Sequence, residues 1–192
     1  MNTPRKSSWL VCTGPLTNAA LLLSTYEDEI CDHLAGICFM GGAVASGNCN
    51  SGVEFNMFAD PESAKIVIET WGDKLHNLVM VPLDVTETAL TTRVIRERMG
   101  KLKGSLALTI SQLWERARIA TAADCDTDKF MFEGEACAVI HDPCAIMYVW
   151  LPELFEGKKF RVDVETQSKV CFGSTVVDVF GRTNKPKNVF VC

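Results

Sequence analysis

The chain has 192 residues, of which 47% are apolar and 22% charged, and its formal net charge is −5. This length and composition predict one globular domain with a hydrophobic core and exclude an intrinsically disordered chain. The mild acidity gives no general attraction to nucleic acid or to an anionic membrane surface, and no apolar stretch is as long as a membrane span, so we expect neither partner.

Short apolar runs bounded by turn residues predict strands, and apolar residues at helical spacing predict helices. The elements expected in the first part of the chain are a strand over 8–12, a helix over 16–34 with a break near Thr25, a strand over 35–40, a polar loop over 46–56, and a helix from Asp60-Pro61-Glu62 to about Trp71.

The second part continues this alternation and then changes to short strands. The elements expected there are a strand over 78–85, helices over 91–103 and 105–122, a polar connection over 123–134, a helix that Asp142-Pro143 opens and that ends near Pro152, and strands over 160–166, 174–180 and 188–192. Alternating helices and continuously apolar strands are typical of a parallel sheet between helices. We therefore predict a single α/β domain over 1–192 with an open, mainly parallel sheet and helices on both faces.

Polar side chains gather where three predicted elements end, and ligands of open α/β sheets bind at the carboxyl ends of the strands. These segments are 13–18, 40–56 and 141–143. Glu54 and Asn56 are two residues apart, so on an extended segment both face one way while Phe55 faces the other. A carboxylate beside an amide suits a vicinal diol such as a ribose, although the spacing alone favours a polar surface loop.

The segment His141-Asp142-Pro143 also has ordinary structural interpretations. Asp142 resembles Asp60, which precedes a proline at another predicted helix start, and this pattern is typical of a helix cap. His141 follows two apolar residues and is compatible with a hydrogen-bonded core histidine.

Nine cysteines at irregular spacings, without a C-x-x-C pair, favour a reduced, cytoplasmic protein whose thiols are small core side chains. Cys137, His141 and Cys144 have the spacing C-x3-H-x2-C. No second pair completes a tetrahedron, so zinc is disfavoured.

Several segments, taken in this order, resemble the nucleoside hydrolases, the inosine-uridine-preferring group of N-ribosyl hydrolases. The matching segments are Val11-Cys12-Thr13-Gly14-Pro15-Leu16-Thr17-Asn18, Met40-Gly41-Gly42 with Gly47-Asn48, Glu54-Phe55-Asn56 with Asp60-Pro61-Glu62, Pro82-Leu83-Asp84-Val85-Thr86, His141-Asp142-Pro143, and Gly173-Ser174-Thr175-Val176-Val177-Asp178. The resemblance covers nearly the whole chain. It implies a Rossmann-like open sheet and hydrolysis of the N-glycosidic bond of purine or pyrimidine ribonucleosides to ribose and free base.

The resemblance also implies a cofactor, a quaternary state and a set of residue roles. The cofactor is calcium, and the assembly is a homo-oligomer, either a dimer or a tetramer. The implied roles are calcium ligation by the backbone carbonyl of Thr13 and the carboxylate of Asp142, contact with the ribose 5′-hydroxyl by Asn48, contact with the ribose hydroxyls by Glu54 and Asn56, lining of the sugar pocket by Met40, and protonation of the departing base by His141.

One part of the family pattern has no counterpart in this sequence. The family opens with Asp-Thr-Asp-Pro-Gly followed by Asp-Asp, which supplies the remaining calcium carboxylates and the general base, and it ends with a further helix. We therefore expect an incomplete nucleoside hydrolase domain that lacks both ends and has an incomplete calcium site. A truncated gene model, a natural fragment and a degenerate family member all stay open.

Two other functions are compatible with parts of the sequence. A catalytically inactive family member that binds ribose or a nucleoside, or serves a structural role, fits the missing aspartates. An unrelated nucleotide-binding domain fits less well, because neither G-x-G-x-x-G nor a P-loop lysine occurs. His141 points toward the inosine-uridine group, and the base preference stays open.

Overall fold

The computed structural model describes residues 4–74, 77–123 and 127–192. By their internal contacts the residues divide into two compact units: Met1–Val85 with Asp142–Cys192, and Thr86–His141. The single domain over 1–192 stays a prediction. In the described ranges, no helix is long and apolar enough to cross a membrane.

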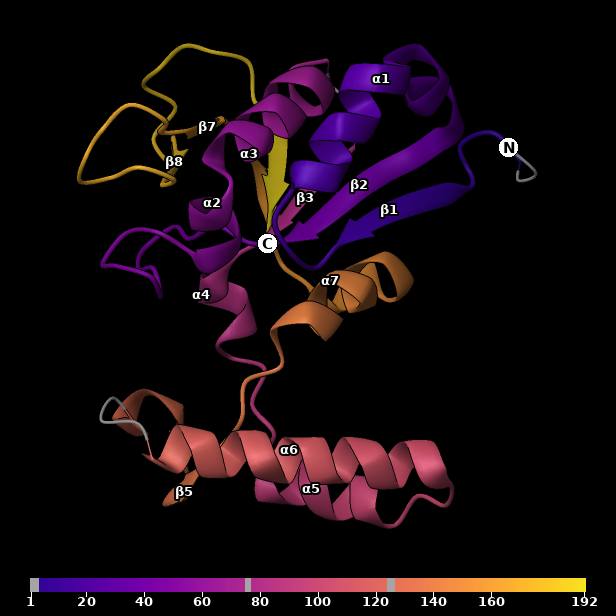
Figure 1. Cartoon of the computed structure of the whole chain (residues 1–192), viewed down its shortest axis with the longest axis vertical. Coiled ribbons are helices and arrows are strands. Elements are labelled where there is room, and N and C mark those ends of the chain that lie inside the picture. The colour runs from indigo at the N-terminus through magenta and orange to yellow at the C-terminus, as the bar shows by residue number, and fades with distance from the viewer. Residues whose placement is uncertain (1–3, 75–76, 124–126) are drawn as a thin grey trace. The chain divides into compact units, whose positions relative to one another are not determined.

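The first unit contains a five-stranded sheet with the strand order β1-β2-β3-β9-β6 (Figure 1). The strands are β1 (Ser8–Cys12), β2 (Leu34–Met40), β3 (Leu78–Val81), β9 (Val189–Val191) and β6 (Lys158–Phe160). The first four strands in this order pair in parallel, and β6 is antiparallel to β9. An open, mainly parallel sheet with short strands near the C-terminus is thereby confirmed.

Helices cover both faces of this sheet (Figure 1). The helices of the first unit are α1 (Thr17–His33), α2 (Phe55–Ala59), α3 (Pro61–Val67) continued by the π-helical turn η1 (Ile68–Gly72), α4 (Leu83–Thr86), which runs into the second unit, α7 (His141–Trp150), and the 3-10 turn η3 (Pro152–Leu154). Ile37 and Phe39 of β2 join the core beneath α1 and α3. Cys38, which points to the other face, donates its Sγ–H to the Ala145 carbonyl of α7 at 3.4 Å.

Two local signals in the sequence are confirmed. The helix α1 has non-helical dihedral angles at Tyr26 (φ −135°, ψ 40°), next to the break expected near Thr25. The helix α3 begins at Pro61, and Asp60 caps it by accepting a hydrogen bond from the Ser63 N–H at 3.1 Å.

Several predicted boundaries are wrong: the loop expected over 46–56 ends where α2 begins at Phe55, the helix expected over 91–103 ends at Gly100, and the strand expected over 174–180 ends at Val177. The strand expected over 78–85 ends at Val81, because Pro82 cannot donate to a strand ladder, and the helix α4 follows. The helix expected to open at Asp142 begins one residue earlier, at His141. The strand expected over 160–166 is interrupted at Arg161, where β6 ends and β7 (Val162–Val164) begins an antiparallel pair with β8 (Thr175–Val177).

The second unit holds two helices and a short hairpin. Its elements are α5 (Arg93–Gly100), α6 (Ser105–Ala123), the 3-10 turn η2 (Thr127–Phe130), and the antiparallel strands β4 (Met131–Phe132) and β5 (Glu135–Ala136). The polar connection predicted over 123–134 therefore contains a short strand, and residues 124–126 of it lie outside the described part. Near the start of the unit, the buried Thr91 hydroxyl donates to the Ala138 carbonyl at 3.1 Å and accepts from the Ala138 N–H at 3.0 Å.

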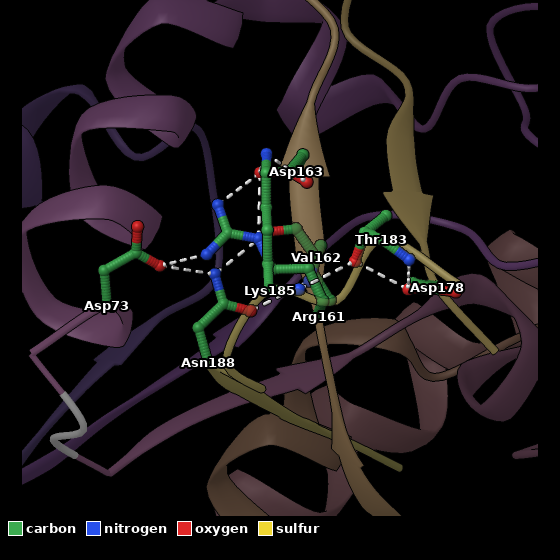
Figure 2. Close-up of polar contacts among 8 residues, drawn as sticks. All are labelled: Asp73, Arg161, Val162, Asp163, Asp178, Thr183, Lys185 and Asn188. Atoms are coloured by element: carbon green, nitrogen blue, oxygen red, sulfur yellow. Dashed lines mark hydrogen bonds and ion pairs between the residues drawn. The ribbon is translucent and has the colours of Figure 1, made fainter. Parts of the chain in front are cut away.

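A buried arginine ties the C-terminal strands of the first unit together (Figure 2). Arg161 is 7% exposed, and its guanidinium bonds Asp73 at 2.7 Å and Asp163 at 3.0 Å. Asn188 donates to the same Asp73 carboxylate at 2.8 Å and accepts from the Val162 N–H at 2.8 Å. The hydrogen bond from Arg161, more than any other cause, lowers the pKa of Asp163.

Replacing Arg161 with methionine is expected to destabilise the first unit by about 2 kcal/mol at neutral pH, because two carboxylates lose their buried cation while keeping partial access to water. The lowered pKa makes Asp163 stabilising above its ordinary value of 3.8, and this contribution is lost as the pH falls through the folded-state value. Urea unfolding at neutral pH and near pH 3 measures the difference. Lys185→Met, which removes only the exposed partner of Asp163, is the control. An Arg161→Met penalty that does not shrink in acid would contradict this account.

Candidate functional site

Four of the predicted site residues lie on the connection from β2 to α2. Met40 is the last residue of β2, Asn48 lies on the loop, Glu54 is the N-cap of α2, and Asn56 is in its first turn. Met40, Glu54 and Asn56 are 3%, 3% and 8% exposed, whereas Asn48 is exposed. The connection therefore brings a carboxylate and an amide together in a buried position.

Glu54 is held by backbone amides. Its carboxylate accepts hydrogen bonds from the N–H groups of Asn56 at 2.9 Å, Met57 at 3.1 Å and Gly42 at 3.1 Å. Burial raises the pKa of Glu54, the three N–H groups lower it, and the charge of Asp142 raises it. A carboxylate has room for about four hydrogen bonds, so Glu54 keeps little capacity for a ligand.

Asn56 keeps more capacity for hydrogen bonds to a ligand. Its Nδ2 donates to the Met40 carbonyl at 3.1 Å and lies 3.4 Å from the Met40 Sδ. Its Oδ1 has no hydrogen-bond partner among the residues that the structure describes. Asn48 uses the opposite end of its amide, because its Oδ1 accepts from the Phe55 N–H at 2.9 Å, whereas Asn56 donates through its Nδ2.

Glu54 and Asn56 both point inward while Phe55 is 57% exposed, as predicted. The predicted cause, an extended segment, is wrong. Glu54 is extended, but Phe55 begins a helix, and Glu54 folds back over its first turn to cap it. The cap, not strand alternation, places the two side chains together.

The backbone between β2 and the loop is fixed at five consecutive residues, 41–45. Each N–H donates to a specific acceptor: Gly41 to the Val81 carbonyl (3.2 Å), Gly42 to Glu54 (3.1 Å), Ala43 to the Thr175 hydroxyl (2.9 Å), and Val44 and Ala45 to the Asp84 carboxylate (2.7 and 3.0 Å). Gly42 has φ +77°, which favours glycine. Sequence reasoning assigned no role to Asp84 or Thr175, although both belong to matching segments.

The two proposed calcium ligands lie after β1 and in α7. Thr13 directly follows β1, and Asp142 is the second residue of α7. Asp142 is therefore inside the first turn, and the interpretation of it as the helix cap is wrong. Its carboxylate is exposed and makes no hydrogen bond or ion pair within the described ranges.

These residues do not form a calcium site by themselves. Calcium takes roughly six to eight oxygen ligands, and Thr13 and Asp142 offer too few. Among residues 4–74, 77–123 and 127–192, no group of three or more His, Cys, Asp or Glu side chains could hold a metal ion.

His141 is held within the second unit. Its Nδ1 lies 2.8 Å from the hydroxyl of the fully buried Thr86, and which of the two donates depends on the imidazole tautomer. This contact fixes one nitrogen of the ring. Thr86 ends the matching segment Pro82–Thr86, but nothing in its spacing to His141 predicts the contact.

Comparisons with known proteins agree with the fold and the motifs. The sequence pattern of the family described as "Inosine-uridine preferring nucleoside hydrolase" matches residues 1–192. A "Probable ribonucleoside hydrolase" of Dictyostelium discoideum is 35% identical over 100% of this chain and 54% of its own. The "Pyrimidine-specific ribonucleoside hydrolase RihA" of Shewanella oneidensis is 38% identical over 95% of this chain and 54% of its own.

A solved structure extends the agreement to three dimensions. The "Purine-Preferring Ribonucleoside Hydrolase from Gardnerella vaginalis" superimposes with a TM-score of 0.80 and 27% identity, over 97% of this chain and 55% of that one. The chain spans about half the length of the curated relatives it matches. By its match over all 192 residues, the chain belongs to the inosine-uridine preferring nucleoside hydrolase family.

Proposed function

We propose that this chain is part of an enzyme that hydrolyses the N-glycosidic bond of ribonucleosides to ribose and free base. The family match over the whole chain carries the proposal. The relatives' names include pyrimidine-specific and purine-preferring enzymes, so we leave both base classes open for this chain.

In this proposal the connection from β2 to α2 binds the sugar. Asn48 contacts the 5′-hydroxyl, Asn56 contacts the other ribose hydroxyls through Oδ1, and Met40 lines the pocket. Glu54, which accepts hydrogen bonds from three amides, contacts the ribose hydroxyls with its remaining acceptor position and contributes its negative charge. Cleavage of the bond builds positive charge on the sugar, which a fixed carboxylate and oriented amide dipoles stabilise.

His141 is the proposed acid for the departing base. Its imidazole, hydrogen-bonded to Thr86, would transfer a proton to the leaving nitrogen. Thr13 and Asp142 are proposed to contribute oxygen ligands to a calcium ion whose remaining ligands lie outside the described residues. We also propose that the protein acts in the cytoplasm as a homo-oligomer.

The 192-residue chain alone is expected to release no measurable ribose from inosine or uridine, because Thr13 and Asp142 leave calcium far short of its ligands. The assay measures ribose in millimolar calcium. The longest protein that the gene encodes is the comparison, with inosine, uridine, cytidine, adenosine and guanosine as substrates. Robust turnover by the 192-residue chain would contradict the incomplete site. Nucleoside binding without turnover by the longest protein would instead identify a binding protein.

A further inference from the structure

The hairpin of β7 and β8 contacts the loop after β2 from a distant part of the sequence. The Thr175 hydroxyl accepts from the Ala43 N–H at 2.9 Å and donates to the Ala43 carbonyl at 2.8 Å, across 132 residues of chain. The neighbouring Ser174 hydroxyl donates to the Gly52 carbonyl at 3.0 Å. The two contacted residues, Ala43 and Gly52, flank Asn48 in the sequence.

Thr175 makes both of its hydrogen bonds in a buried, closely packed place. It is 8% exposed, and a Cβ added to Gly42 would lie 3.0 Å from its Cγ2 and its Oγ1. The peptide that joins Gly42 to Ala43 therefore has little room to turn while Thr175 is in place. The N–H of Gly42, on the same short segment, is one of the three that Glu54 accepts.

The structure thus links Thr175 to Glu54 through two adjacent residues. Thr175 fixes Ala43, Glu54 binds the N–H of Gly42, and Glu54 caps the helix that carries Asn56. Within the described ranges, the Thr175 side chain makes no hydrogen bond to Asn48, Glu54 or Asn56, so its hydroxyl acts on them through the backbone of this segment.

We propose that Thr175 is a positioning residue of the ribose site: its hydroxyl holds residues 41–53 in the conformation that presents Asn48, Glu54 and Asn56 to the sugar. The inference rests on the proposed function for its substrate and on the hydrogen bonds to Ala43 for its mechanism. Ser174 holds the far end of the same loop.

Hydrogen exchange of the 192-residue chain tests the mechanism without any activity. In Thr175→Val, which keeps the shape and removes the hydroxyl, amide exchange over 41–56 is expected to rise about ten-fold, because two hydrogen bonds are lost. Thr175→Ser keeps the hydroxyl and is expected to restore slow exchange. Ser174→Ala, a milder change, is expected to accelerate exchange near Gly52 only.

Thr91→Val is the matched control. Thr91 makes the same pair of hydrogen bonds, to the N–H and the carbonyl of Ala138, and is likewise buried. Its loss is expected to leave exchange over 41–56 unchanged. Unchanged exchange over 41–56 in Thr175→Val, or equal acceleration in Thr91→Val, would overturn the proposal. Should Thr175→Val not fold, Thr175→Ala, which removes the hydroxyl and the methyl group, decides: unchanged exchange over 41–56 would overturn the proposal.

A second measurement tests whether the Thr175–Ala43 hydrogen bonds affect turnover of the substrate. In the longest protein that the gene encodes, Thr175→Val is expected to lower kcat/KM for inosine or uridine about ten-fold, with recovery in Thr175→Ser. If loop exchange responds to Thr175 in a protein that binds no nucleoside, the proposed function is refuted and the role of Thr175 in fixing the loop stands. Loop exchange that responds while kcat/KM stays unchanged would overturn the positioning role.

Discussion

Asn56→Ala is expected to lower kcat for ribose release about 100-fold, a loss of about 3 kcal/mol of barrier stabilisation, in the longest protein that the gene encodes. The Asn56 Oδ1 is the acceptor that the described residues leave without a partner, and in our proposal its contact with the sugar strengthens as positive charge develops. Steady-state kinetics with inosine and uridine, together with thermal unfolding, measure the two effects separately.

Asn77→Ala controls for loss of the hydrogen bond alone. The Nδ2 of Asn77 donates to the Ala35 carbonyl near the start of β2 at 3.0 Å. The Nδ2 of Asn56 makes the corresponding bond to the Met40 carbonyl at the end of β2. We expect Asn77→Ala to keep kcat. An Asn56→Ala variant with nearly normal kcat and a much lower Tm would make Asn56 structural.

Glu54→Ala is expected to behave differently from Asn56→Ala. It leaves the helix α2 without its cap, which costs about 1 kcal/mol, and leaves the buried N–H of Gly42 without an acceptor, which costs about 1–3 kcal/mol. Stability and turnover should therefore fall together.

Asp142→Asn is expected to abolish detectable calcium binding by the longest protein that the gene encodes, with little change in the stability of the metal-free protein. The substitution keeps the side-chain shape and removes the charge that calcium requires. Asp142 makes no capping hydrogen bond, so the fold loses only a favourable first-turn charge, about 0.5 kcal/mol. Calorimetric titration with calcium measures the affinity.

Asp60→Asn is the paired control at the other Asp-Pro helix start. Asp60 caps α3 and also accepts from the Thr17 hydroxyl, which is the main cause that lowers its pKa. Asparagine caps about as well as aspartate, so the helix should be retained. Calcium affinity should not change, because Asp60 is not a proposed ligand. Equal calcium affinities for the two variants would refute the ligand role of Asp142.

The elements that depend on a local residue pattern were predicted from the sequence. Apolar runs gave β1 and β2, and Asp60-Pro61 gave the start of α3. The strand expected over 78–85 is too long because apolar composition does not distinguish Val79 in a strand from Val85 in a helical turn, whereas Pro82 ends the strand.

The residues of the proposed site were named from the sequence, and their geometry was not predicted. Glu54 and Asn56 were identified together, yet their arrangement comes from a cap whose carboxylate also reaches Gly42. Thr175 could not be given a role from the sequence, because its partner lies 132 residues away and no periodicity records such a contact.

The five anchored amides of residues 41–45 also bear on the order of folding. Their acceptors come from β3, α4, the cap of α2 and β8, at separations from 12 to 132 residues. Closing long loops costs entropy before any of these bonds forms, so we expect the segment to become ordered only after the sheet, the helix α4 and the hairpin have assembled. We therefore expect a nascent or partly unfolded chain to have the strands before it has the geometry of the proposed sugar site.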